Sequence, residues 1–159
     1  QGETMDQVKT EAPSYAGHIH RDVTRHDGDM TITLDFEARF LRRKRMATDC
    51  GMAFMVDLAE TVSLDAGDAF LLDDGRQIII QAAAEPVVEI RHQNLAKIAW
   101  HIGNRHTPCE IRQDFLVIRR DHVLEDLLVR LGTTLAKTQA PFNPEGGAYG
   151  FGRTHGHTH

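Results

Sequence analysis

The strongest constraint on the fold is a change of hydrophobic period at residues 82–86. Before this point, short stretches alternate apolar and polar residues or are rich in β-branched residues, as strands do. After it, apolar residues recur every three or four positions in two separate segments, as in amphipathic helices. We therefore expect an all-β domain followed by a domain that mixes helices and strands, and Pro86 marks the boundary.

The first half predicts strands over residues 31–36, 52–56 and 77–81. Aspartate and glycine in residues 65–68 and 73–75 predict tight turns between the strands, because both residue types tolerate positive φ. Calcium binding by these aspartates is the alternative, but turns are much more common for this pattern.

The second half predicts the order strand, helix, strand, strand, helix, strand, which is the ferredoxin-like βαββαβ pattern. The first helix begins near Asn94, and the second begins after Asp121 as N-cap and ends at Gly132. Both helices should pack on one face of the sheet. The predicted fold class is α+β, with an N-terminal β domain over residues 1–84, a ferredoxin-like domain over 85–145, and a flexible, disordered Gly/His tail over 146–159.

Charge and composition exclude several kinds of partner. The 159 residues carry a net charge of -5, whereas nucleic acids and anionic membranes require a positive field. The chain has two cysteines, Cys50 and Cys109, which lie far apart and form no CxxC pair, so a disulfide framework or zinc knuckle is not indicated.

The N-terminal segment gives no targeting signal. No apolar run approaches the length of a membrane span, and residues 1–13 lack the apolar centre of a secretory signal, so we expect a cytoplasmic protein. Gln1-Gly2 resembles what remains after a tag is cleaved, in which case Met5 is the natural start.

His106 is the first candidate metal ligand, because neutral imidazole suits nickel, copper and zinc. His101 precedes it by five residues, and at 100° per residue the two would point about 140° apart on a helix, so they do not chelate one ion as a pair. A metal at His106 therefore needs ligands from elsewhere, and a two-fold partner supplies the same residue. The alternative is a histidine that caps the helix end.

The tail carries three more candidate ligands, His155, His157 and His159, in a glycine-rich context where no core can use them. A cloning artefact is the alternative, although purification tags normally have contiguous histidines.

Other residue types give weaker signals. Cys109 lies three residues after His106 and is either a soft ligand, a nucleophile or a buried thiol, of which the last is commonest. His122 is best read as a surface residue. The basic run 42–45 indicates contact with an acidic partner or solubility. No serine elbow or phosphate-binding glycine loop is present, so we expect no enzyme activity.

Three separated motifs, at residues 101–106, 121–126 and 140–150, resemble the urease accessory protein UreE family. The likeness is close in the second half. It extends to the first half through the arginine-rich strand at residues 42–45 and the hairpin at 72–76.

The resemblance implies a nickel metallochaperone in which a β domain similar to a chaperone's peptide-binding domain precedes a ferredoxin-like metal-binding domain. It implies that His106 meets its counterpart in a homodimer, or in a tetramer, and holds Ni²⁺ between subunits while tail histidines add ligands. The implied partners are the urease accessory GTPase and the urease apoprotein complex. Zn²⁺ or Cu²⁺ should substitute in vitro, by the ligand chemistry.

The chain departs from the family pattern at two places. Some relatives have a histidine two residues before the position of His122, where this chain has Arg120, so a peripheral metal site is not expected. The three tail histidines indicate delivery of one or two ions rather than storage. The main alternative function is a zinc or copper buffer unrelated to urease, and a thiol or metal-dependent hydrolase using His106 and Cys109 is the enzyme alternative.

Overall fold

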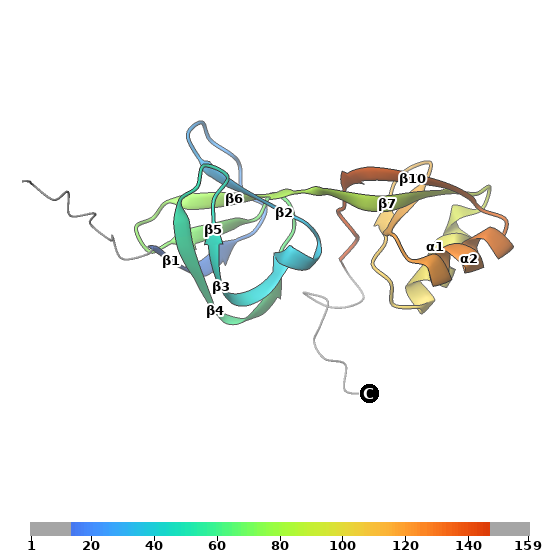
Figure 1. Ribbon diagram of the computed structural model, residues 1–159, viewed down its shortest axis with the longest axis horizontal. Helices are drawn as coiled ribbons and strands as arrows, with labels where there is room; N and C mark the ends of the chain where they lie inside the picture. The colour runs from blue at the N-terminus through green and yellow to red at the C-terminus, as the bar shows by residue number, and fades with distance from the viewer. Residues whose placement is uncertain (1–13, 147–159) are drawn as a thin grey trace, which may run out of the picture.

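The computed structural model describes residues 14–146, which form two β-sheets side by side along the long axis of the molecule, with both helices beside the second sheet (Figure 1). In chain order the elements are β1 (Ser14–His20), β2 (Met30–Leu34), η1 (Glu37–Arg39), β3 (Phe40–Ala47), β4 (Ala53–Ser63), β5 (Ala69–Leu72), β6 (Gln77–Ala82), β7 (Ala84–Arg91), α1 (Leu95–Asn104), β8 (Glu110–Ile111), β9 (Leu116–Arg119), α2 (His122–Arg130) and β10 (Thr134–Pro141).

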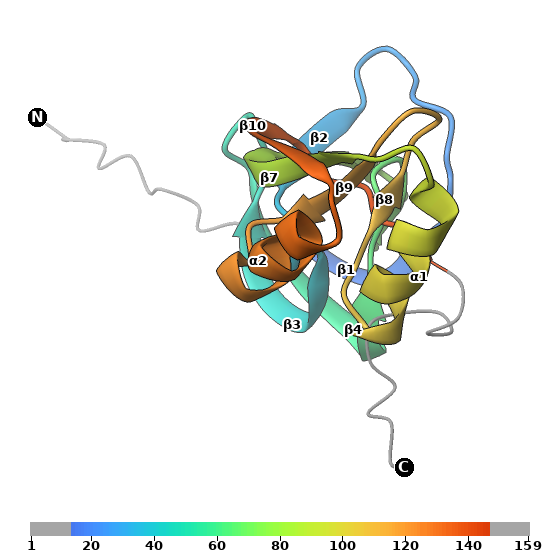
Figure 2. The same cartoon turned by 90° about the vertical axis from the view of Figure 1, so that its right-hand side faces the viewer.

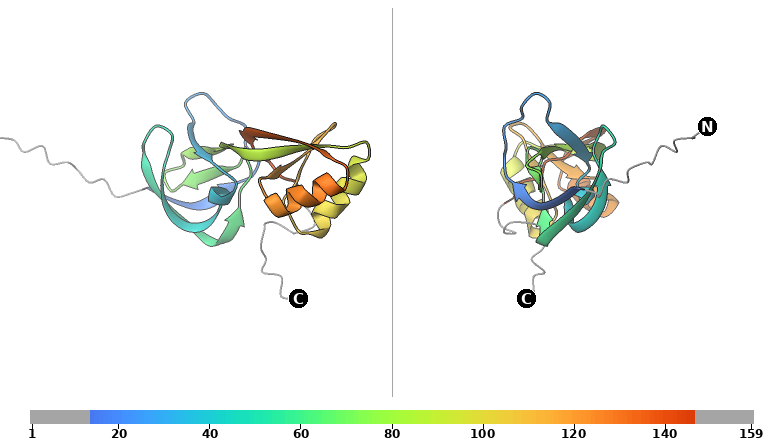
Figure 3. Two further views of the ribbon diagram at one scale, coloured as in Figure 1. Left: turned by 45° about the vertical axis from the view of Figure 1, so that its right-hand side comes forward. Right: turned by 90° about the vertical axis from the view of Figure 1, so that its left-hand side faces the viewer.

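The first sheet has six strands in the order β2-β6-β5-β1-β4-β3, and it curls around its own apolar core (Figure 3). The alternation in β2 is typical: Ile32 and Leu34 are buried, while Thr31 and Thr33 face outward and bond to Asp49. This period of two is what the sequence pattern predicts for a strand with one buried face.

The predicted strand over residues 31–36 ends earlier than its alternation indicates. Asp35 accepts a hydrogen bond from the amide of Ala38 at 2.9 Å, which turns the chain into the short helix η1. Phe36 therefore leaves the first sheet and packs against Phe142 of the second half, with ring centroids 5.4 Å apart. Phe36, which continues the apolar alternation of β2 in the sequence, therefore contributes to the contact between the two sheets and not to the strand.

Only Ala83 separates β6 from β7, so the chain passes from one sheet to the next almost without a linker (Figure 1). Pro86, expected at the boundary, lies inside β7 opposite Gln139 of β10. Pairing with β9 begins only at Val87, so the missing N–H of proline needs no partner on that side.

The second sheet has four strands in the order β10-β7-β9-β8, and both helices lie on one of its faces (Figure 2). Ile98 and Ile102 of α1 and Leu124 and Leu128 of α2 share a core with alternate residues of β7 and β9. The predicted α+β class, with a β domain before a βαββαβ arrangement, is confirmed, and both helices do pack on one face.

The opposite face of this sheet meets the first half of the chain. Val87, Val117 and Phe142 form a small core with Phe36. Beside it the guanidinium of Arg39, 1% exposed, donates hydrogen bonds to three backbone carbonyls: Leu34 at 3.1 Å, Leu64 at 3.2 Å and Phe142 at 2.5 Å. Burial lowers the pKa of Arg39, against the nearby carboxylates that raise it. Arg39 therefore links the two halves through Phe142, the residue that follows β10.

The predictions for residues 1–4, for Met5 and for His155, His157 and His159 lie outside the described residues. Among residues 14–146, neither helix has the length and apolarity needed to cross a membrane.

Candidate metal-binding site

The candidate site lies where α1 ends. The amide of His106 donates to the carbonyl of Gly103 at 3.0 Å, and the amide of Thr107 donates to the carbonyl of Ile102 at 3.4 Å. These two bonds are the Schellman arrangement, which satisfies carbonyls left unpaired at a helix C-terminus. The arrangement places the residue after the C-cap Arg105 in the left-handed region, and that residue is His106, with φ of 57°.

A left-handed histidine is a specific choice. The position normally takes glycine, because a Cβ in this conformation approaches the following carbonyl and costs about 1–2 kcal/mol. His106 is off the helix and exposed, so its side chain does not contribute to a core of the described residues. Backbone strain of this kind is concentrated at functional sites.

His101 lies within α1, whereas His106 lies beyond its end. His101 is half-buried, with its ring edge-on to Trp100 at 5.1 Å between centroids. Trp100 itself is 63% exposed. Trp100 lies outside the apolar stripe of α1, whose buried residues are Ile98 and Ile102, so the helical period is enough to predict it as a surface residue.

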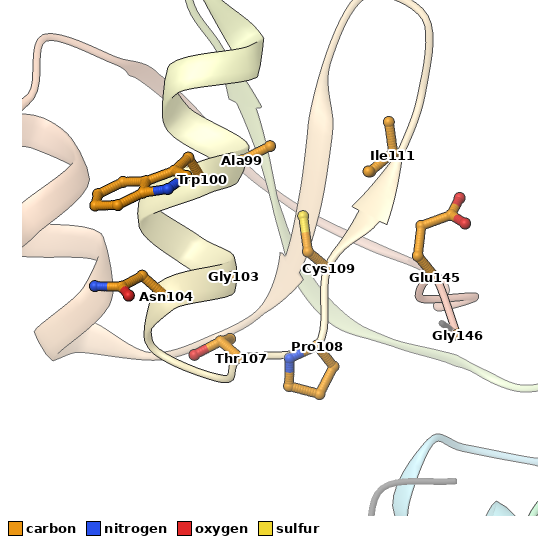
Figure 4. A pocket seen from close by; sticks show the side chains of 10 residues that line it. All are labelled: Ala99, Trp100, Gly103, Asn104, Thr107, Pro108, Cys109, Ile111, Glu145 and Gly146. Atoms are coloured by element: carbon orange, nitrogen blue, oxygen red, sulfur yellow. The ribbon is translucent and has the colours of Figure 1, made fainter. Parts of the chain in front are cut away.

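An open groove of about 400 Å³ runs between α1 and β8, next to the residues that lead into His106. Figure 4 shows Ala99 and Gly103 of the helix facing Cys109 and Ile111 across it, with Glu145 and Gly146 on the strand side. Most of its exposed lining is apolar.

Cys109 is a poor ligand or nucleophile in this setting. The pKa of its thiol is raised to about 11, chiefly by burial; a bond from the backbone of Val117 acts to lower it, and the nearby carboxylates of Glu110 and Glu145 act to raise it. The sulfur lies 3.7 Å from the carbonyl of Glu110. At neutral pH the group is therefore a thiol, whereas metal binding and nucleophilic attack require the thiolate.

The chain that leads to the tail is anchored beside this groove. The amide of Asn143 donates to buried Glu110 at 2.6 Å, and the amide of Glu145 donates to the carbonyl of Cys109 at 2.9 Å. The other oxygen of Glu110 accepts from Arg112 at 2.5 Å. These bonds fix where the chain leaves the domain, a point that motif reading did not reveal.

The structure does not bring the remaining candidates together. His122 is exposed at the first position of α2, and no group of three His, Cys, Asp or Glu side chains within residues 14–146 is arranged to hold a metal. Arg120, at the position of the peripheral histidine, donates to both oxygens of Glu125 at 3.2 Å. The three tail histidines are not among the described residues.

The other sequence signals are structural. Gly67 and Gly75 have φ of 95° and 90°, as the predicted turns require. Asp68 accepts bonds from Arg21 and from the amides of Asp22 and Asp65, so its oxygens are already used. The basic run 42–45 lies exposed on β3, an edge strand of the first sheet.

Comparison with known proteins places these features in a family. The model of the UreE urease accessory protein, N-terminal domain, matches residues 14–83, and that of its C-terminal domain matches residues 85–159. A protein of Ruegeria pomeroyi named urease accessory protein UreE is 53% identical over 143 residues, which cover 87% of this chain and 96% of the relative. The protein of that name from Paracoccus denitrificans is 60% identical, covering 79% of this chain and 80% of the relative. The one from Cereibacter sphaeroides is 59% identical, covering 80% and 70%. These relatives are named accessory proteins rather than enzymes.

Proposed function

Because the chain belongs to the UreE urease accessory protein family, we propose that it is a nickel metallochaperone which binds Ni²⁺ between two subunits and delivers it for assembly of the urease active site. The observation that carries this proposal is His106, an imidazole held outside α1 in a strained left-handed conformation and facing solvent.

The remaining ligands must come from beyond residues 14–146 of one chain, because this part contains no three-residue metal cluster. A two-fold axis near His106 supplies a second copy of the same imidazole. Exposed Trp100, six residues before His106, gives the surface of α1 the apolar character that a subunit contact requires.

The tail supplies further ligands within reach. Gly146 lies at the groove, nine residues before His155, so the imidazole of His155 can lie up to about 30 Å away along an extended chain. His157 and His159 reach farther. A tail histidine then completes the coordination shell, and an incomplete, water-open shell keeps the ion exchangeable for delivery.

The proposed metal and partners follow from membership of the UreE family and from the chemistry of imidazole ligands. Nickel is the cargo, while Zn²⁺ or Cu²⁺ should bind the same imidazoles, and by the Irving–Williams order copper binds at least as tightly. Selectivity for nickel must then come from the metal supply and from partner recognition.

We propose that the protein works in the cytoplasm as a homodimer, or a tetramer around one ion, that hands nickel to the urease accessory GTPase and the urease apoprotein complex. We also propose the division into a peptide-binding-like domain over 1–84, a metal-binding domain over 85–145 and a tail over 146–159.

The test is a calorimetric Ni²⁺ titration with solution mass measured alongside. The parent should be a dimer with one tight ion for two chains. His106→Gly should remove that step, because it deletes the imidazole while keeping the left-handed backbone. His122→Gln is the matched control, since it removes another exposed histidine of the same domain. Binding that survives in His106→Gly and disappears with the tail histidines would make His106 structural.

A further inference from the structure

The groove beside α1 exposes apolar surface that nothing in the described part of the chain covers. Ile111 is 52% exposed, and Ala99 and Gly103 of the helix face it and Cys109 across the groove (Figure 4). Trp100, 63% exposed, also lines the groove, although its ring projects from the other side of the helix. A continuous apolar hollow of about 400 Å³ is large enough to take an aromatic side chain, and exposed apolar patches of this kind mark binding sites.

Gly103 adds an independent observation. It lies in the last turn of α1, where glycine costs about 1 kcal/mol relative to alanine. A Cβ built at this position meets no atom within 4 Å, so the packing of the described residues does not require glycine. A missing side chain on the wall of the groove widens it, and the cost in helix stability is understandable if something else fills the space.

The chain itself leads into this groove. Gly146, the last described residue, is part of the lining, and the preceding Glu145 is fixed by its bond to the carbonyl of Cys109. Two aromatic residues follow closely, Tyr149 after three residues and Phe151 after five. An extended chain carries them at most about 10 and 18 Å from Gly146, so both can reach the groove.

We propose that the groove between α1 and β8 binds the chain's own segment 149–151, with the aromatic side chains of Tyr149 and Phe151 on the apolar wall formed by Ala99, Gly103 and Ile111. Tethering raises the local concentration of the segment to the millimolar range, so a weak contact suffices. Charge agrees, because Arg153 is the one lysine or arginine after Lys137 and Glu145 lies at the rim.

Docking has a consequence that rests on the proposed function. Phe151 precedes His155 by four residues, or at most about 14 Å of extended chain, so a docked segment keeps the tail histidines near the end of α1. The aromatic residues then act as positioning residues that shorten the search of His155 for the ion at His106. The docking itself requires no metal.

Cys109 lines the groove and reports whether it is covered. The experiment measures the rate of alkylation of Cys109 at pH 8.5, with EDTA present, in full-length Cys50→Ser protein. The comparison adds Tyr149→Ser and Phe151→Ser together, and the matched control instead adds His155→Ser and His157→Ser. Both pairs of substitutions lie in the same tail, and neither pair changes a residue within residues 14–146.

We expect Cys109 to react about fivefold faster in the aromatic double variant than in the parent, as for a tethered segment whose local concentration exceeds its Kd several times. The histidine control should react at the parent rate. Equal rates in all three proteins would overturn the proposal. Protection that depends on protein concentration and ignores the aromatic residues would assign the groove to a second copy, which also overturns it. Because no metal is present, these outcomes are independent of the nickel titration.

Discussion

His106 occupies at the end of α1 the same left-handed position that Gly132 occupies at the end of α2, with φ of 57° and 83°. The pattern of hydrogen bonds is shared as well. The amides of Gly132 and Thr133 donate to Val129 and Leu128, just as those of His106 and Thr107 donate to Gly103 and Ile102. One helix uses the residue that the backbone favours, and the other accepts strain to present an imidazole.

This pair predicts opposite effects of substitution on stability. His106→Gly should raise the free energy of unfolding by about 1 kcal/mol, because glycine removes the Cβ contact, whereas Gly132→Ala should lower it by about 1–2 kcal/mol. Urea unfolding followed by circular dichroism measures both. A destabilised His106→Gly protein would show that the imidazole has a structural role in the fold.

The ends of the two helices differ in how well the sequence predicts them. The start of each helix is local information, because the side chain of Asn94 accepts from the amide of Lys97 and that of Asp121 from the amides of Val123 and Leu124. Gly132 likewise predicts the end of α2, because glycine is the usual residue at this left-handed position. The left-handed conformation of His106 has no such signal in its residue type, since histidine rarely ends a helix in this way.

Contacts between segments that are distant in the sequence are not predicted by the local pattern either. Phe36 continues the alternation of β2, but its ring packs against Phe142, and the guanidinium of Arg119 lies 4.4 Å from its ring centre. Neither of these distant partners can be inferred from the local sequence around Phe36. β3 was missed by pattern alone, because residues 42–45 of this edge strand are exposed on both faces and show no alternation.

Arg39 should be the most sensitive polar residue of the contact between the two halves. Arg39→Met keeps the length of the side chain but leaves the carbonyls of Leu34, Leu64 and Phe142 without their donor, so we expect a loss of about 3 kcal/mol in unfolding free energy. Arg43→Met is the control. Its ion pair with Asp57 is exposed, and its loss should cost less than about 0.5 kcal/mol. Equal effects of the two variants would contradict the linking role of Arg39.

The two cysteines should differ in their alkylation by iodoacetamide. The hydroxyl of Thr48 and then the amide of Met52 lower the pKa of exposed Cys50, while burial raises that of Cys109 to about 11. Cys50 therefore holds more thiolate at pH 7.5 and reacts first. The rate of Cys50 should level off at a lower pH than the rate of Cys109, which should keep rising toward pH 11. Mass spectrometry of digested samples follows each site, and a faster Cys109 at pH 7.5 would refute this order.

Nickel binding should weaken in acid. Protons compete with the metal for imidazole nitrogen, and free imidazole takes up a proton near pH 6.5, so affinity should be constant above about pH 7.5 and fall steadily below about 6.5. The two His106 side chains alone give a limiting slope of a hundredfold loss in affinity for each pH unit, because two protons displace one metal, and a tail histidine in the shell makes the slope steeper. His106→Gly removes this steep component and leaves only what the tail histidines contribute. The measurement is a series of Ni²⁺ titrations from pH 5.5 to 8 on both proteins. A parent affinity that does not change over this range excludes histidine as the main ligand, and a slope near tenfold would mean that a single imidazole carries the site.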